Sequence, residues 1–328
     1  MIMTRLIADI GATNARFALL DDGLQHGSPE AIRVFSVQSY PGLDDAIDGY
    51  LSATAVSADA ITRAAICVAG PVQGDQVAMT NHPWDFSQNN IRERFGLIDL
   101  RVLNDFTAMA LSLPRLKAGD RRQIGGTAPT KDGPKAVLGP GTGLGVSGLI
   151  STSNNPHHQV WQPLSGEGGH VTLPAMTDRE AAILHTERER TGHVCAEDFL
   201  CGRGLVSLYH AVCATDGLTP PRNLIPADVT NRALDNSDPV AVETVELFCG
   251  WLGSVAGNLT LTLGATGGVY IAGGIIPRLG AFFDRSPFRD RFQQKGRFED
   301  YLAPIPAYVV THEFPAFLGL MAALDQPA

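Results

Sequence analysis

The feature that most constrains the fold is a unit that occurs twice: an apolar run, a turn rich in glycine, and a second apolar run. The first copy spans residues 5–20 and turns at 11–14, and the second spans 136–150 and turns at 139–145. Two apolar runs joined by a tight turn are typical of paired strands. Such a pattern is expected of a duplicated domain with a nucleotide between its halves.

Strand-like and helix-like patterns alternate along the rest of the chain. Short apolar runs predict strands at 31–37, 63–69, 98–103, 268–274 and 307–310. Helical spacing or capping signals predict helices at 43–55, Ser87–Gly96, 106–113, Thr177–Gly192 (with a capping box to Glu180), Asp238–Gly264, and from Pro315 onward. This alternation is typical of α/β architecture. No repeat with a fixed period of 20–50 residues is found.

Length and charge narrow the class of protein. A chain of 328 residues predicts about two domains, and the polar segment 115–135 is the expected crossover between them. The 25 basic and 34 acidic residues give a net charge of −9, which argues against a nucleic-acid partner. Only four residues are lysines, whereas 35 are glycines. We therefore expect any bound phosphate to be held by backbone amides.

Cysteine usage and hydropathy bear on the compartment. The five cysteines form no CxxC pair, so no zinc site or disulfide framework is expected, and isolated thiols fit a reducing cytosol. Arg5 and Asp9 interrupt the apolar N-terminus too early for a signal peptide. No apolar run reaches 18 residues, so no membrane span is expected.

The first glycine turn follows Asp9 at the end of an expected strand. Gly11 allows a turn that exposes consecutive N–H groups, which form a nest for an anion, and Thr13 adds a hydroxyl. Asp9 then stands where it can hold Mg²⁺, an ion that prefers oxygen ligands and retains water. The alternative is an ordinary hairpin with a capping aspartate.

Two further segments place glycine at strand ends. The turn at 139–145 has four glycines in seven residues, which is costly in backbone entropy unless a ligand approaches the backbone closely. It is neither a Walker A loop nor a dinucleotide-binding turn. Gly273 and Gly274 end another strand, where a flat base can lie on the backbone or where the chain simply turns.

Polar side chains that can carry chemistry lie at three further places in the sequence. Asn104 and Asp105 end a strand, where Asp105 can accept a proton from a hydroxyl or where either residue can cap the next helix. Glu167 and His170 lie among three glycines and can bind vicinal hydroxyls of a sugar. For Glu197 the sequence alone favours a structural role, that of an acid in the first turn of a helix, where the helix dipole stabilises a negative charge.

Six motifs occur in a fixed order: DIGATN at 9–14, LNDF at 103–106, GPGTGLG at 139–145, SGEGGH at 165–170, AED at 196–198 and IAGG at 271–274. With this order, nearly the whole chain resembles the bacterial glucokinase family, in the group related to the enteric enzyme. The separate ROK group usually carries a cysteine-rich zinc motif, which this sequence lacks.

The resemblance implies an actin-like, ribonuclease-H-like α/β fold with two domains around a cleft. The small domain is expected at 1–115 plus 309–328, and the large domain at 116–308. The implied activity is ATP-dependent phosphorylation of D-glucose at O6 with Mg²⁺, by a cytoplasmic homodimer.

The resemblance also implies residue roles. Asp105 matches the general base, and the sugar contacts are Asn104, Asp105, Glu167, His170 and Glu197. The first phosphate loop matches Ala8, Asp9, Ile10, Gly11, Ala12 and Thr13, the second matches Thr142 and Gly143, and adenosine is expected at Gly273 and Gly274. Ala12 stands where the family usually has a second glycine, and a methyl group there disfavours a positive φ.

Three other functions are considered, and sequence features discriminate two of them. A kinase for another hexose would share all the motifs, so only assays across sugars separate it. A sugar-responsive regulator on the same fold would need an N-terminal helix-turn-helix, for which no room is expected before the first strand. A filament- or chaperone-type actin relative would lack the acid–histidine set of SGEGGH.

Overall fold

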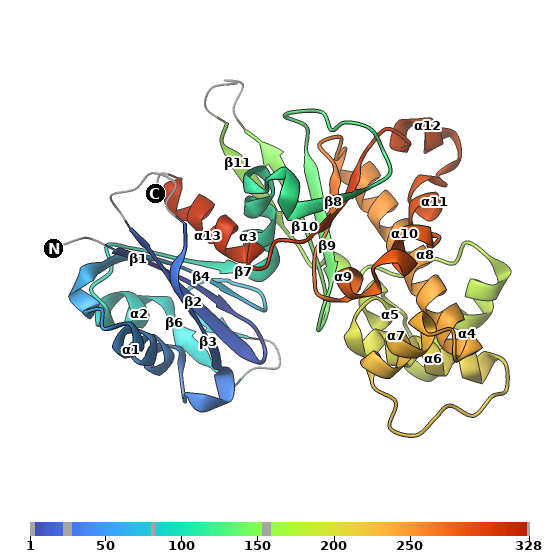
Figure 1. Cartoon of the computed structure of the whole chain (residues 1–328), viewed down its shortest axis with the longest axis horizontal. Coiled ribbons are helices and arrows are strands. Elements are labelled where there is room, and N and C mark those ends of the chain that lie inside the picture. The colour runs from blue at the N-terminus through green and yellow to red at the C-terminus, as the bar shows by residue number, and fades with distance from the viewer. Residues whose placement is uncertain (1–3, 22–27, 80–82, 153–158, 327–328) are drawn as a thin grey trace. The chain divides into compact units, whose positions relative to one another are not determined.

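The computed structural model describes residues 4–21, 28–79, 83–152 and 159–326 (Figure 1). The chain divides into two compact units, Met1–Leu116 with Glu313–Ala328 and Lys117–His312. The expected return to the small domain at residue 309 falls inside a strand, β13 (Ala307–Val310), that pairs with two strands of the second unit. Those hydrogen bonds keep residues 309–312 in the second unit.

The first unit is built on a five-stranded sheet in the order β3-β2-β1-β4-β7. Its strands are β1 (Thr4–Ile10), β2 (Asn14–Asp21), β3 (Glu30–Ser36), β4 (Ile61–Val68) and β7 (Asp99–Asn104). β1, β2 and β3 are antiparallel neighbours, whereas β1, β4 and β7 run parallel. The parallel strands therefore end at one edge, which in open α/β sheets is the edge that binds ligands.

Helices cover both faces of this sheet. They are α1 (Leu43–Thr54), α2 (Gln88–Arg94), α3 (Asp105–Ser112) and α13 (Pro315–Asp325), with a small ribbon of β5 (Gln76–Ala78) and β6 (Asp85–Ser87). Leu6 and Ala8 of β1 lie in one core cluster with residues of α1 and α2, while Ile7 lies in another with residues of α3 and α13. Since strand side chains alternate, Asp9 lies on the same face as Ile7.

The second unit has a six-stranded sheet in the order β11-β10-β9-β12-β13-β8. Its other strands are β8 (Arg121–Ile124), β9 (Lys135–Pro140), β10 (Leu144–Ser151), β11 (Trp161–Ser165) and β12 (Val269–Ile271). Its helices are α4 (Asp178–Thr191), α5 (Ala196–Phe199), α6 (Gly202–Thr215), α7 (Pro226–Leu234), α8 (Pro239–Leu263), α9 (Ile275–Leu279), α10 (Ala281–Arg285), α11 (Phe288–Gln293) and α12 (Glu299–Leu302). Short 3₁₀ turns are η1 (Val37–Ser39), η2 (Ala58–Ala60), η3 (Leu113–Arg115), η4 (Ala118–Asp120), η5 (Gly168–His170) and η6 (Gly296–Phe298).

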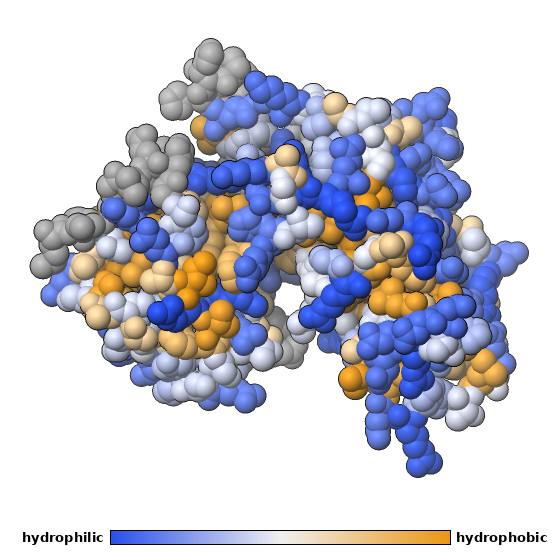
Figure 2. Space-filling model, in the orientation of Figure 1, coloured by the Kyte–Doolittle hydropathy of each residue, from blue (hydrophilic) through white to orange (hydrophobic). Residues whose placement is uncertain are grey.

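The long helix α8 forms the centre of the second unit. By length and composition it is apolar enough to cross a membrane, but 72% of its most apolar window is buried inside the protein. Gly253 and Gly257 explain how closely α11 packs on it, because a Cβ there would lie 2.2 Å from the carbonyl oxygen of Phe288 and 2.4 Å from that of Phe292. The helical part of this unit shows a largely hydrophilic surface in Figure 2, as expected when apolar side chains point inward.

Most sequence predictions of strands and helices are confirmed, but the sequence analysis predicts no counterpart for β5, β6, α6, α7 and α9 to α12. Three further predictions need correction. β8 lies in the segment 115–135, for which the sequence predicts a crossover, and β11 has no counterpart among the predicted strands. The capping box is half right. Thr177 accepts the N–H of Glu180, but the Glu180 carboxylate accepts the N–H of Met176 and pairs with Arg291. A buried carboxylate needs a cationic partner more than a second capping role.

Candidate active site

Three neighbouring parallel strands of the first unit end in polar side chains. Asp9 of β1 lies beside Cys67 of β4, and Asn104 of β7 lies beside Val68 of β4. The Cys67 thiol is buried, and its pKa is raised well above the ordinary value by burial and by the negative charges of Asp9 and Asp105. The structure thus gathers both predicted carboxylates at the carboxyl edge of one sheet.

Asn104 and Asp105 join β7 to α3. Asn104 is the N-cap of α3, since its Oδ1 accepts the N–H groups of Phe106 at 2.9 Å and Thr107 at 3.2 Å. Its Nδ2 donates to the carbonyl of Gly70 at 3.0 Å, which fixes the amide plane. The capping alternative is therefore confirmed for Asn104. Asp105, half-buried in the first turn of the helix, accepts the N–H of Phe106 at 2.8 Å.

The first glycine turn exposes fewer amides than expected. The N–H of Gly11 donates to the carbonyl of Asn14 at 3.0 Å and closes the turn. Within the described ranges, the N–H groups of Ala12 and Thr13 have no hydrogen-bond partner, and Thr13 is exposed. Ala12 has no positive φ, so its methyl group causes no strain. Two consecutive amides thus remain for an anion.

Ala8 and Ile10 belong to the core rather than to the turn. Both side chains are fully buried, and both residues pair with β2 and β4. The carbonyl of Ile10 accepts the N–H of Ala69 at 3.2 Å. The predicted phosphate loop is therefore reduced to residues that a ligand can reach, Asp9 and 11–13.

Asp9 makes an ion pair that the sequence motifs do not indicate. Its Oδ2 accepts from Nη1 of Arg16 at 3.1 Å, and its Oδ1 accepts from the Cys67 thiol at 3.5 Å. Burial raises the pKa of Asp9, against the lowering effect of Arg16. The pairing follows from the hairpin register, in which Asp9 lies opposite Arg16.

Asp9 also determines which metal chemistry fits. Across residues 4–21, 28–79, 83–152 and 159–326, no group of three or more His, Cys, Asp or Glu side chains could hold a metal ion. The side chain of Asp9 remains 21% exposed, so its carboxylate is accessible from solvent. A single carboxylate fits Mg²⁺, which takes its remaining ligands from water and phosphate.

In the second unit, two glycine segments pack against each other. The turn between β9 and β10 is closed by a bond from the N–H of Gly141 to the carbonyl of Gly143 at 2.8 Å. Gly273 follows β12, which runs parallel beside β9. It has φ +84°, and a Cβ there would lie 2.3 Å from the carbonyl oxygen of Pro140. The backbone conformation and the packing inside the protein therefore allow only glycine at position 273.

Glu167 directly precedes the 3₁₀ turn η5 of the same unit, and His170 is the last residue of that turn. Both side chains are exposed, whereas the glycines between them pack on β10. A Cβ at Gly168 would lie 2.7 Å from Cγ1 of Val146, and one at Gly169 would lie 2.1 Å from the carbonyl oxygen of Leu144. The glycines thus hold the turn close to the strand, and both the acid and the histidine remain exposed, with Nδ1 of His170 3.9 Å from Sγ of Cys195.

Glu197 links this region to the glycine turn. Its Oε2 accepts the N–H of Leu144 at 2.8 Å, and its Oε1 accepts from Nη2 of Arg203 at 2.5 Å. A Cβ at Gly143 would lie 2.5 Å from Oε2, so Gly143 leaves room for the carboxylate. As expected, Glu197 lies in the first turn of a helix, α5. Its carboxylate, however, binds the N–H of Leu144 at the glycine turn. The sequence gives no sign of Arg203, because no periodicity relates it to Glu197.

Four glycines at these turns have no internal reason to be glycine. They have no positive φ, and a Cβ on each would meet no atom closer than 3.5 Å: Gly11, Gly141, Gly166 and Gly274. An alanine would fit in the protein itself at each position. The geometry of the protein itself therefore does not require glycine at these four positions.

Comparison with known proteins identifies the family. The glucokinase family model matches residues 6–327. The chain belongs to the glucokinase family. A glucokinase from Aromatoleum aromaticum is 52% identical over 98% of this chain and 94% of its own length. The crystal structure of a glucokinase from an Antarctic psychrotroph is 36% identical, covers 99% of both chains, and has a TM-score of 0.85.

A more distant structure shares the fold. It is the ROK family glucokinase from Streptomyces griseus in complex with glucose and AMPPNP, with a TM-score of 0.62 at 18% identity, covering 98% of each chain. These matches confirm the predicted family and the predicted actin-like α/β fold class. They fit a chain built from two α/β units that each contain a strand–glycine turn–strand hairpin.

Proposed function

We propose that this chain transfers the γ-phosphoryl group of ATP to O6 of D-glucose, forming glucose 6-phosphate and ADP. The observation that carries the proposal is Asp105, a carboxylate at the carboxyl edge of the sheet in a chain of the glucokinase family. The Streptomyces griseus structure was solved with glucose and with AMPPNP, an ATP analogue, which supports the same pair of ligands here.

Asp105 is proposed as the general base. Phosphoryl transfer depends mainly on positioning and on charge stabilisation, so the base aligns the 6-hydroxyl and accepts its proton as the bond to phosphorus forms. The N-cap bonds of Asn104 fix the start of α3 and hence the carboxylate of Asp105. The second hydrogen of the Asn104 amide is left for a sugar oxygen.

The second unit supplies the other proposed sugar contacts. Glu167 and His170 are exposed at η5, and Glu197 lies on the adjacent α5. A carboxylate accepts hydrogen bonds from hydroxyl groups, and a histidine both donates and accepts. This set fits vicinal hydroxyls of a hexose.

Backbone amides are proposed to hold the phosphates of ATP. The candidates are Ala12 and Thr13 on the first unit and the Thr142–Gly143 turn on the second, with adenosine at Gly273–Gly274. Mg²⁺, when bound with ATP beside Asp9, neutralises charge that develops on the phosphates. This arrangement explains how an acidic chain with four lysines can bind a strongly anionic nucleotide.

We also infer that the protein is a cytoplasmic homodimer. All five cysteines are free and buried, which fits a reducing compartment. The dimer follows from the family resemblance alone.

The test of the general base is Asp105→Asn, which keeps the shape and removes the charge. We expect kcat to fall about 10²–10⁴-fold, the usual contribution of a general base. Glucose should still bind, as measured by calorimetry, because the other sugar contacts are intact. Near-normal turnover of the variant would contradict the role given to Asp105.

A further inference from the structure

A chain of contacts in the second unit joins Glu197 to the glycine turn. It runs from the guanidinium of Arg203 to the carboxylate of Glu197 and on to the N–H of Leu144, with donor–acceptor distances of 2.5 and 2.8 Å. We call this chain the Glu197 brace. Each oxygen of the carboxylate has one of these two partners, so the brace fixes the plane of the carboxylate.

A second contact ties the same helical region to the same turn. The N–H of Gly202, at the start of α6, donates to the carbonyl of Gly141 at 2.8 Å. Gly143 has no space for a Cβ because Oε2 of Glu197 would be 2.5 Å away. The turn at 141–143 and the carboxylate of Glu197 are therefore in direct contact.

The exposure of the two side chains distinguishes the Glu197 brace from a contact within the hydrophobic core. The side chain of Glu197 is 14% exposed, whereas that of Arg203 is 64% exposed. An arginine so exposed buries little apolar surface, and surface ion pairs contribute little to stability. What Arg203 does provide is a charged, planar donor to a carboxylate that is mostly buried.

We infer that Arg203 is a positioning residue that couples the sugar site to the phosphate-binding turn through Glu197. The inference rests on the proposed function, which gives Glu197 to the sugar and the Thr142–Gly143 turn to the phosphates. A sugar hydroxyl that donates to Glu197 and a phosphate that orders the turn then favour the same arrangement of the brace. By linkage, each ligand tightens the binding of the other by the same factor.

The test is a calorimetric measurement of glucose affinity with and without saturating AMPPNP. The ratio of the two dissociation constants is the coupling factor. We expect the wild-type factor to be about 5-fold or more, the usual lower range for coupled sites. In Arg203→Met the factor should fall toward 1, and in Arg203→Lys, which keeps the charge but loses the planar donor, it should be intermediate.

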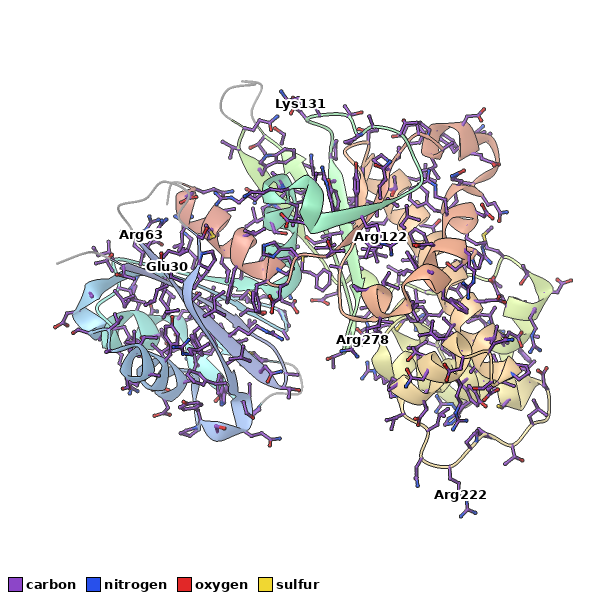
Figure 3. The ribbon with its side chains drawn as sticks, in the orientation of Figure 1. Glu30, Arg63, Arg122, Lys131, Arg222 and Arg278 are labelled. Carbon is purple, nitrogen blue, oxygen red and sulfur yellow. The ribbon has the colours of Figure 1, made fainter. Side chains whose placement is uncertain are left out.

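Two controls isolate the route of the effect. Arg222→Met removes an exposed arginine that extends from the loop after α6 (Figure 3) and should leave the factor and the midpoint of thermal unfolding unchanged. In a Glu197→Gln background, Arg203→Met should have no further effect, because the two residues act through one contact.

The possible outcomes are distinct. A wild-type factor of 1, an unchanged factor in Arg203→Met, or additive effects of the Arg203 and Glu197 substitutions would each overturn this inference while leaving the proposed function intact. If the wild-type protein neither binds nor phosphorylates glucose, the proposed function fails and the inference falls with it. A reduced factor in Arg203→Met with intermediate recovery in Arg203→Lys would support the brace.

Discussion

Two glycines of the second unit allow a direct separation of ligand binding from internal packing. Gly141 has no positive φ, and the nearest atom to a Cβ added there would be 4.0 Å away, whereas Gly273 has φ +84° and would place its Cβ 2.3 Å from a backbone oxygen. The same substitution, glycine to alanine, should therefore have opposite effects on stability at the two positions.

The expected magnitudes follow from these geometries. Gly141→Ala should stabilise the protein by about 0.4–1 kcal/mol, because alanine restricts the unfolded chain and meets no obstacle in the folded one. Gly273→Ala should destabilise it by roughly 2–5 kcal/mol, the sum of about 1–2 kcal/mol for left-handed backbone and about 1–3 kcal/mol for overpacking. Unfolding in urea, followed by circular dichroism, measures both changes.

Activity separates the two roles at Gly141. The new methyl group stands beside the Thr142–Gly143 turn that we assign to the phosphates, so we expect the loss of a charged hydrogen bond worth about 1.5–3 kcal/mol. The KM for ATP should then rise about 10- to 100-fold, since about 1.4 kcal/mol corresponds to a factor of ten. An unchanged KM for ATP in Gly141→Ala, in a protein at least as stable as the wild type, would refute the assignment of this turn to phosphate.

Two further predictions concern buried charges. Glu180→Gln leaves Arg291 without its carboxylate in a site where the side chains of Glu180 and Arg291 are 1% and 12% exposed. Urea denaturation should therefore show that the free energy of unfolding falls by about 3–5 kcal/mol. A fall of less than about 1 kcal/mol, as for a surface ion pair, would contradict this prediction. Burial lowers the pKa of Lys135 from 10.5 to about 8, so the folded state carries a penalty below pH 8 that disappears as the pH rises to 10.5. The stability of the wild type relative to Lys135→Met should therefore increase by about 3 kcal/mol over that range, and a pH-independent difference would contradict the burial of a charged amine.

The fold is predictable where periodicity and capping agree. The long helix α8 begins after the Asp238 cap and ends at Gly264, as its sequence indicates. The edge strand β8 reads RRQI and escapes prediction, because charged residues protect sheet edges and hide the strand pattern. β11, at the opposite edge of that sheet, has three exposed residues among its five and lacks a clean alternation.

The site is predictable where the chemistry follows directly on a strand end. Asp9, Asn104 and Asp105 lie at such ends, and the structure gathers them at one edge. Arg16 could be found from the hairpin register. Arg203 could not, because its contact with Glu197 depends on how α5 and α6 pack on a turn that lies about fifty residues earlier in the chain.

The central claim is that the chain phosphorylates glucose with ATP. The most direct test is a steady-state scan of the purified protein with glucose, fructose, mannose and N-acetylglucosamine against ATP, ADP and polyphosphate, following formation of the sugar phosphate. We expect the highest kcat/KM for glucose with ATP, and no ATP hydrolysis above background without a sugar. A higher kcat/KM for another hexose or another donor, or ATP hydrolysis that is independent of sugar, would contradict the claim.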